Sequence, residues 1–317
     1  MWGLPGSKEC TEADDLTPVN EGVIFEDLHP LLIPLAQSSK SGNLVCALKG
    51  LNQDKSPLPI VESKVGAPGY NLLAVNSEHL MRRIASEADA AKSNNDVIEI
   101  YNEGLGQGQL QDKGLDSPYE IGSVEKLGYG VDKFTLLRVG PFPDLYSKMS
   151  TQHIGRDDES SALIAAEAAN GKFTGFGSTY LSYAKLLASL PKRDEESRDA
   201  ARICLRLPIS SSGMNVDDLK SIAVLAQLTE ANSSLEDCLD KMSEMYEKIR
   251  ESEKEEEGTQ SSGKTPEQIA LDEATYLLDR AVLSQRSWSD VRSELAGIYG
   301  DAQREDMAAF VNPNTFQ

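Results

Sequence analysis

One stretch of the sequence carries the residue types and spacing of a phosphate-binding loop. Residues 258–265 read GTQSSGKT, which matches the pattern G-x-x-x-x-G-K-[ST] at every position. A working loop needs a buried strand before it and a helix after it, so that its backbone N–H groups point at the phosphates. The match therefore predicts ATP or GTP binding by Gly263, Lys264 and Thr265 only where that structural context is present.

The residues around this stretch favour a linker over a phosphate loop. It follows YEKIRESEKEEE (246–257), the polar end of a predicted helix, whose glutamates would repel a nucleotide. Thr265 before Pro266 is typical of a helix start. A threonine side chain caps the free N–H groups of the first turn, and the N–H group that proline lacks would have no helical partner at the first helical position. We interpret residues 254–264 as a flexible, exposed linker. Nucleotide binding by the GTQSSGKT stretch is the alternative function.

The histidines and cysteines form no recognisable metal or redox motif. No histidine lies three or four residues from another histidine or a cysteine, the spacing by which one element supplies two zinc ligands. The cysteines are far apart and form no C-x-x-C pair, so we expect reduced thiols. The sequence therefore predicts no metal and no cofactor. The residues concerned are His29, His79, His153, Cys10, Cys46, Cys204 and Cys238.

Three further candidates for chemistry are better explained as local structure. KFTGFGSTY (172–180) is not the G-x-S-x-G elbow of hydrolases, and Ser178 is predicted to cap the helix that follows. GLGQG (104–108) lacks the spacing of a dinucleotide-binding turn and is predicted as a loop. The aspartate pairs at 157–158 and 217–218 stand at predicted helix starts, where carboxylates stabilise the helix dipole. We therefore assign no catalytic residue and predict that the chain is not an enzyme.

The elements that would position any site fall into an α+β part followed by an all-α part. Short apolar runs between turn residues predict strands, and apolar residues at spacings of three and four predict helices. The first part contains predicted strands at 43–51, 59–65, 70–75, 119–127 and 132–142, a helix at 77–90, a helix or strand at 96–105 and a loop at 104–118. The second contains predicted helices at 157–170, 178–190, 194–207, 216–229, 233–256, 266–284, 288–299 and 301–311. The fold class is thus mainly α, with a helical bundle or an array of helical hairpins after the α+β part.

This division also predicts the domain organisation. We expect a flexible acidic arm over 1–27, a small α+β domain over 28–150, an all-α domain over 151–312 and a tail at 313–317. The linker at 254–264 interrupts the helical domain.

The charge of the chain limits its partners. The formal net charge is −20, from 51 acidic and 31 basic residues. A general nucleic-acid binder must neutralise phosphates with lysine and arginine, so we exclude that class, and adhesion to an anionic membrane surface is disfavoured too. No segment has the roughly 20 apolar residues of a membrane span. Any partner is expected to be neutral or basic where it touches the chain.

One stretch allows a more specific binding hypothesis. VGAPGYNLLAVNSEHLMRR (65–83) contains a turn, a strand and a capped helix with two adjacent arginines, predicted to face away from the apolar side of the helix. One interpretation is that the stretch is simply the core of the small domain, since turn glycines usually serve geometry. The other is that Arg82 and Arg83 form a local positive spot for the carboxylates of a partner.

The same stretch resembles a known family, together with SGNLVCALKG (41–50) upstream and SWSDVRSELAGIYG (287–300) downstream. The chain is similar to the nuclear-encoded assembly factors of photosynthetic complexes in plant and green-algal chloroplasts, most of all to stromal factors for ATP synthase. The resemblance covers roughly residues 23–312 and carries no catalytic residue. It implies a chaperone-like protein of the chloroplast stroma that binds a subunit of such a complex, with the ATP synthase catalytic head as the expected partner.

The resemblance has two further implications. The chain would reach the thylakoid surface only through its partner. Members of the family are made with a transit peptide, whereas MWGLPGSKEC at the start of this chain has no such character. The expectation is a chain whose targeting segment is absent.

Overall fold

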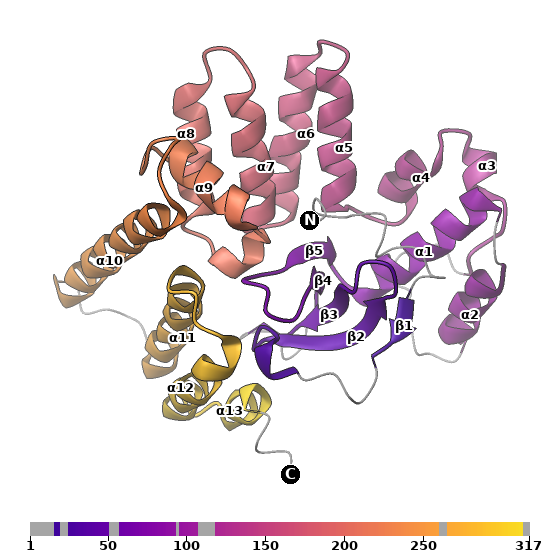
Figure 1. Ribbon diagram of the computed structural model, residues 1–317. Coiled ribbons are helices and arrows are strands. Elements are labelled where there is room, and N and C mark those ends of the chain that lie inside the picture. The colour runs from indigo at the N-terminus through magenta and orange to yellow at the C-terminus, as the bar shows by residue number, and fades with distance from the viewer. Residues whose placement is uncertain are drawn as a thin grey trace. The chain divides into compact units, whose positions relative to one another are not determined.

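A computed structural model of the chain describes residues 16–19, 25–50, 57–92, 95–106, 118–259 and 265–312. In this described part, one five-stranded sheet precedes most of the helices (Figure 1). The predicted fold class, mainly α with an α+β first part, is confirmed.

Contacts divide the chain into two compact units, each built from segments that are separate in sequence. Unit 1 contains residues 1–21, 33–63 and 71–174, and unit 2 contains residues 22–32, 64–70 and 175–317. The units follow spatial contacts and do not test where independently folding domains begin. The predicted boundary between residues 150 and 151 therefore stays a prediction.

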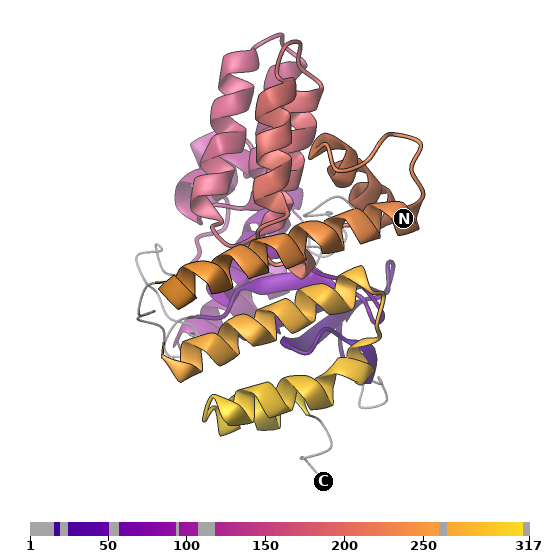
Figure 2. The same ribbon diagram turned by 90° about the vertical axis from the view of Figure 1, so that its left-hand side faces the viewer.

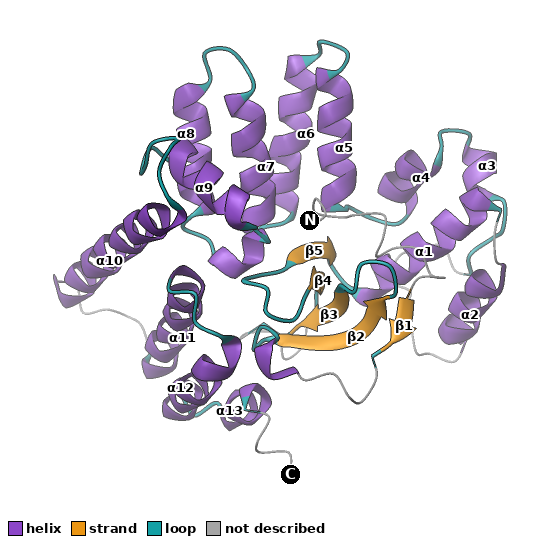
Figure 3. Cartoon of the chain, viewed as in Figure 1, coloured by secondary structure: helices purple, strands orange, loops and turns teal. Residues whose placement is uncertain are grey.

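The sheet belongs to unit 1, and its strands follow one another in sequence order (Figure 3). The predicted strands at 43–51, 59–65 and 70–75 are confirmed as the last three of the sheet. The first two were not predicted, because a proline interrupts the apolar run that forms the second. Leu16↔Ser38 is one antiparallel pair between the first two strands, so a strand occupies part of the segment expected to be a flexible arm. The strands are β1 (Leu16–Pro18), β2 (Leu32–Ser38), β3 (Leu44–Leu48), β4 (Ile60–Ser63) and β5 (Asn71–Ala74).

Six helices complete the described part of unit 1. The first starts where predicted, because the Asn76 side chain accepts a hydrogen bond from the N–H of His79 at 2.8 Å. Buried residues of β3, β4, β5 and the helices form one apolar core that includes Val45, Leu73 and Ile84. The helices are α1 (Ser77–Ala91), α2 (Asn95–Gly106), α3 (Ser123–Leu127), α4 (Val131–Arg138), α5 (Pro143–Ile154) and α6 (Glu159–Lys172).

The prediction of strands at 119–127 and 132–142 is wrong, since these segments contain α3 and α4. A contact from a distant residue decides the first of them. The Asp89 carboxylate accepts hydrogen bonds from the N–H groups of Gly122 and Val124 and thereby fixes the start of α3. After α4, Gly140 lies against the ring of His79, where an added Cβ would come within 2.5 Å of ring atoms. Helix α5 was not predicted, and the ambiguous segment 96–105 is the helix α2.

Among its described residues, unit 2 consists of helices, two short 3-10 turns and the loops that join them. The helices predicted from residue 178 onward are confirmed, with ends shifted by a few residues. In the last part of the chain, α10 packs against α11 and α11 against α12 (Figure 2). The elements are η3 (Phe25–Asp27), α7 (Gly177–Ala188), α8 (Asp194–Cys204), η4 (Ile209–Ser212), α9 (Val216–Leu225), α10 (Leu235–Thr259), α11 (Pro266–Leu283), α12 (Trp288–Asp301) and α13 (Glu305–Val311).

Local caps explain where several of these helices begin. Asn215 and Asp218 form a reciprocal capping box at the start of α9, and Ser287 caps α12. Thr265 accepts a hydrogen bond from the N–H of Gln268 and so caps α11, as predicted. These starts are encoded by residues that lie within one helical turn.

Candidate functional site

Arg83 is a structural residue of unit 1. Its guanidinium makes two parallel hydrogen bonds to Asp144, at 2.7 and 2.6 Å, and a third to Glu87 at 2.9 Å. It also lies 4.8 Å from the centroid of the Phe142 ring. Burial lowers the pKa of Arg83, but the hydrogen bonds and charges of the two carboxylates outweigh burial and raise the pKa above its ordinary value. The side chain ties α1 to the start of α5.

Arg82 lies on α1 next to Arg83 but has different surroundings. Its guanidinium carbon is 5.9 Å from the ring centroid of Tyr101 and 5.5 Å from that of Tyr119, and it donates to the Tyr101 hydroxyl at 3.3 Å. Only 4% of the residue is exposed. The arginines were predicted to face away from the apolar side of the helix, yet both are buried, because α1 is covered on more than its apolar side.

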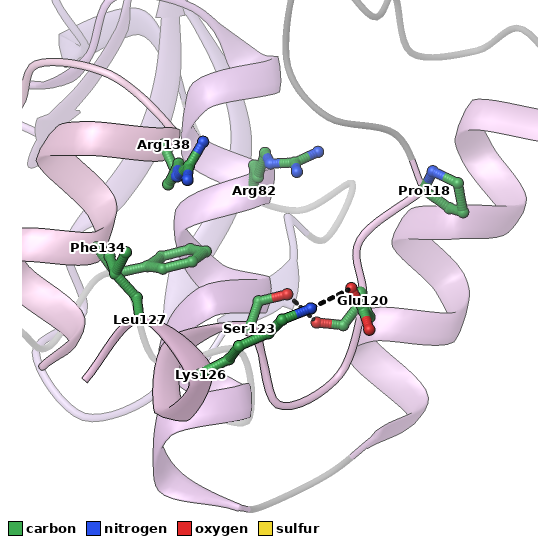
Figure 4. A pocket seen from close by; sticks show the side chains of 8 residues that line it. All are labelled: Arg82, Pro118, Glu120, Ser123, Lys126, Leu127, Phe134 and Arg138. Atoms are coloured by element: carbon green, nitrogen blue, oxygen red, sulfur yellow. Dashed lines mark hydrogen bonds and ion pairs between the residues drawn. The ribbon is translucent and has the colours of Figure 1, made fainter. Parts of the chain in front are cut away.

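A pocket of about 360 Å³ opens beside Arg82, between α1, α3 and α4 (Figure 4). Arg82, Lys126 and Arg138 supply positive charge to its lining, and Glu120 supplies the negative charge. Glu120 pairs with Lys126 at 3.9 Å. Both partners of that pair are more than 70% exposed at their side chains, so the interaction is weak and screened.

Buried contacts hold the polar wall of the pocket in place. Asp89, itself buried, accepts a hydrogen bond from the Tyr119 hydroxyl at 3.0 Å in addition to those from Gly122 and Val124. Burial, more than the other influences, raises the pKa of Tyr119, so the hydroxyl keeps its proton and acts as donor. These hydrogen bonds to Asp89 thus anchor the segment that carries Glu120, Ser123 and Lys126 to α1. The pocket is a feature of the fold and not of a loose loop.

Sequence reasoning found only one residue of this pocket. Lys126 and Arg138 were missed because the segments that carry them were predicted as strands. Each stands in the last turn of a short helix, α3 or α4. A basic residue in the last turn is favoured by the helix dipole, and that local signal was available in the sequence.

The phosphate-loop candidate lies in a different context from a nucleotide site. The helix α10 runs to Thr259, so a helix and not a strand leads into the motif, and the first half of the expected linker at 254–264 is helical. Residues 260–264 lie outside the described residues. Thr265 serves α11 as its cap. Nothing in the described residues favours nucleotide binding.

The other residues that the sequence offered for a functional site have structural roles or no role that we can assign. Ser178 is not a cap, because α7 begins one residue earlier and Phe176 occupies the cap position. Asp158 caps α6 and lies 3.1 Å from His153, whereas Asp157 precedes it with φ of 57°. The pair at 217–218 stands in the first turn of α9, as predicted. GLGQG (104–108) begins inside α2, so its first residues are helical, and the rest lies outside the described residues.

Two of the buried titratable groups of unit 2, His29 and Asp279, take no part in a recognisable site. His29 packs between the rings of Tyr70 and Trp288, and burial, assisted by the charge of Arg292, lowers its pKa to about 3. Asp279 accepts the N–H of Ile209 at 2.7 Å, and burial raises its pKa to about 7. Both groups link segments of unit 2, since His29 and Ile209 lie far in sequence from α11 and α12.

Two further observations on the described residues concern metal binding and membrane-spanning helices. No group of three or more His, Cys, Asp or Glu residues there could hold a metal ion. No helix of that part is long and apolar enough to cross a membrane. The described cysteines Cys46, Cys204 and Cys238 are buried free thiols.

Comparisons with known proteins give results that agree with one another. Three family models match successive parts of the chain: PAB N-terminal over residues 23–121, PAB middle domain over 143–229 and PAB C-terminal domain over 242–314. The Arabidopsis thaliana protein IN CHLOROPLAST ATPASE BIOGENESIS, chloroplastic, is 32% identical over 292 residues, which is 90% of this chain and 79% of that protein. No solved structure matches the chain.

Proposed function

The chain belongs to the family of the protein IN CHLOROPLAST ATPASE BIOGENESIS, and on that premise we propose that it is an assembly factor for the chloroplast ATP synthase. The observation that carries the proposal is the similarity itself, which extends over 90% of the chain. Because only about a tenth of the chain lies outside it, the similarity overlaps the regions of all three family models and both compact units.

We propose further that the role is non-catalytic and chaperone-like. The chain would bind one subunit of the ATP synthase, in the catalytic head, and would hold it until assembly. The contact would form in the chloroplast stroma, and the chain would meet the thylakoid surface only through that subunit. Arg82 and Arg83 were the residues that the sequence offered for such a contact. Of the two, Arg82 lines a pocket, whereas Arg83 is occupied by Asp144 and Glu87.

Affinity purification tests this proposal directly. The tagged chain would be introduced into chloroplasts, and the proteins that co-purify would be quantified by mass spectrometry. We expect subunits of the ATP synthase at sub-stoichiometric levels, because an assembly factor leaves its client once the complex is complete. An unrelated stromal protein of similar acidity, with the same tag, controls for charge. Equal recovery of ATP synthase subunits with both baits would contradict the proposal.

A functional measurement complements the purification. Chloroplasts that lack the chain should accumulate less assembled ATP synthase, while other photosynthetic complexes stay at normal levels. Native gel electrophoresis of pulse-labelled membranes separates slow assembly from fast degradation. A normal rate of assembly in the absence of the chain would exclude the proposed role.

A further inference from the structure

Two successive parts of α10 are held in unit 2 in different ways. In the first part, the side chains of Cys238, Leu239 and Met242 are buried. Across residues 243–252, all of which the structure describes, no residue is buried, although the helix continues alongside α11 (Figure 2). A segment with few buried apolar side chains opens more easily than the core of a unit. Polar contacts with α11 therefore decide how firmly the segment 243–252 is held.

Three polar contacts join this segment to α11, and they differ in burial. Two of them involve the solvent-accessible carboxylates of Glu247 and Glu273, so water competes for those contacts and each contributes little. In the third, Tyr246 faces Asp279, which is only 4% exposed. A polar contact in a buried place is stronger and more costly to leave incomplete. The contact at Asp279 is therefore the one on which the segment depends most.

The hydrogen bonds around Asp279 are complete only if its carboxyl group carries a proton. Oδ1 accepts the N–H of Ile209 at 2.7 Å. The hydroxyl oxygen of Tyr246 lies 3.4 Å from Oδ2 of Asp279 and 3.3 Å from the carbonyl oxygen of Leu207. A tyrosine hydroxyl has one proton and cannot donate fully to both acceptors. With a proton on Oδ2, Asp279 donates to the Tyr246 oxygen and Tyr246 donates to Leu207, so every group has a partner.

The groups that face Asp279 supply no positive charge. Burial, and after it the charge of Asp279, raises the pKa of Tyr246 on α10 and of Tyr70 in the loop before β5, so both tyrosines stay neutral. Cys204 of α8, which acts on Tyr246, is likewise kept protonated by burial. The turn η4 has no charged residue, and among the described residues no charged side chain of α12 contacts Asp279. An ionised Asp279 would thus be a buried charge without a cation, which is costly.

We infer that Tyr246 and Asp279 form a proton-dependent switch that holds residues 243–252 of α10 against α11. With the proton in place, one chain of hydrogen bonds joins α10, α11 and the backbone at 207–209. When the proton is lost, the segment 243–252 opens so that water reaches the carboxylate, while the buried first part of α10 stays packed against α9. The switch is a property of unit 2 alone and does not depend on the proposed function.

Hydrogen exchange of the purified full chain tests the switch. Mass spectrometry follows peptides from 243–252 and, as a reference, from α1 at pH 5 and pH 7, and each rate is divided by that of an unstructured peptide at the same pH. The pKa of Asp279 is about 7 in the closed state and its ordinary value is 3.8, so opening is favoured as pH rises. We expect opening of 243–252 to increase at least about tenfold from pH 5 to pH 7, with little change in α1. Opening that does not depend on pH, or equal changes in both helices, would overturn the inference.

A matched pair of variants assigns the effect to Asp279. Asp279→Asn keeps the shape of the protonated side chain and cannot ionise, and its amide donates to Tyr246 as the carboxyl group does. We expect the slow exchange of the wild type at pH 5 to persist in this variant at pH 7. Glu273→Gln removes an accessible carboxylate from the same helix and should keep the pH dependence of the wild type. If Asp279→Asn retains that dependence, or if Glu273→Gln abolishes it, Asp279 is not the switch.

Tyr246→Phe keeps the inference testable if Asp279→Asn does not fold. It removes the hydroxyl alone, so the proton of Asp279 and the carbonyl of Leu207 lose their partner. We expect opening of 243–252 to increase several-fold at pH 5, with exchange of α1 unchanged. Exchange equal to that of the wild type would exclude Tyr246 from the switch and overturn the inference. The affinity purification described above does not depend on this result, so failure of the switch leaves the proposed function standing.

Discussion

Each compact unit contains a buried arginine that ties distant segments together, and the two are held by different chemistry. In unit 1, Arg83 is bound by the carboxylates of Asp144 and Glu87. In unit 2, Arg292 of α12 donates to backbone carbonyls of Glu26 and Leu28 near η3 and of Val311 at the end of α13, at 2.9, 2.6 and 3.0 Å.

The two arginines also differ in how their positive charge is compensated. Opposite charges raise the pKa of Arg83, whereas burial lowers the pKa of Arg292 and the charges of Asp27 and Glu26 only partly oppose it. A carbonyl dipole compensates a buried cation less than a carboxylate does. Arg83 therefore belongs to a neutralised cluster, while Arg292 acts as a donor of many hydrogen bonds to backbone.

Removing Arg83 should have the largest effect on stability. Arg83→Met leaves Asp144 and Glu87 without their cation, and breaking a buried pair in this way costs about 3–5 kcal/mol. Urea denaturation followed by circular dichroism measures the free energy of unfolding. Arg83→Met combined with Asp144→Leu should recover part of the loss, because no orphaned charge remains at that position. A loss below about 1 kcal/mol in the single variant would show that the cluster is not neutralised through Arg83.

Removing Arg292 should cost less. Arg292→Met leaves buried carbonyls without donors, but no buried charge remains, so we expect a loss of about 2–3 kcal/mol. The same urea experiment applies. Arg286→Met, a more exposed arginine just before α12, is the control and should change the free energy of unfolding little. If Arg292→Met destabilises as much as Arg83→Met, the distinction between carboxylate and carbonyl partners has no energetic meaning here.

A fall in pH should change the stability of unit 2 through two groups whose effects have opposite signs. The pKa of His29 is lowered from 6.5 to about 3, so its stabilising contribution is lost as pH falls through this range. The pKa of Asp279 is raised from 3.8 to about 7, so its contribution is full below 3.8 and is lost as pH rises through 7. Each slope approaches about 1.4 kcal/mol per pH unit, and between pH 4 and 6.5 the two nearly cancel.

Single substitutions should uncover each slope. Relative to the wild type, Asp279→Asn should lose stability as pH falls from 6.5 to 4, and His29→Gln should gain stability over the same range. The free energy of unfolding is measured in urea at several pH values, with His153→Gln as a control on a partly exposed histidine. If the free energy of unfolding of both variants changes with pH as that of the wild type does, His29 and Asp279 do not titrate as their burial implies.

The pocket should respond least. Arg138→Gln is expected to change the free energy of unfolding by less than about 0.5 kcal/mol, because the side chain is exposed. Thermal unfolding of the variant and of the wild type is the measurement. A larger loss would place Arg138 with the structural arginines.

Much of the secondary structure could be predicted, but the candidate site could not. The caps Asn76, Asn215 and Thr265 lie within a turn of the groups that they satisfy, so local sequence reveals them. The pocket depends on α3 and α4, and the contact that fixes α3 comes from Asp89 on α1, more than 30 residues away. No local pattern contains that information.

The sequence by itself therefore determined the mainly helical class, most helix positions and the helix start at Thr265. Helix periodicity and capping act over one or two turns, and the acidic segment before the motif already argued against a phosphate loop. Only the tertiary structure decided that Arg83 binds two carboxylates whereas Arg82 packs against two tyrosine rings beside a pocket. Arg82 and Arg83 are identical in type and next to each other on α1, and their surroundings come from Asp144, Tyr119 and other residues far along the chain. Long-range packing, and not residue type, gives the two side chains different surroundings.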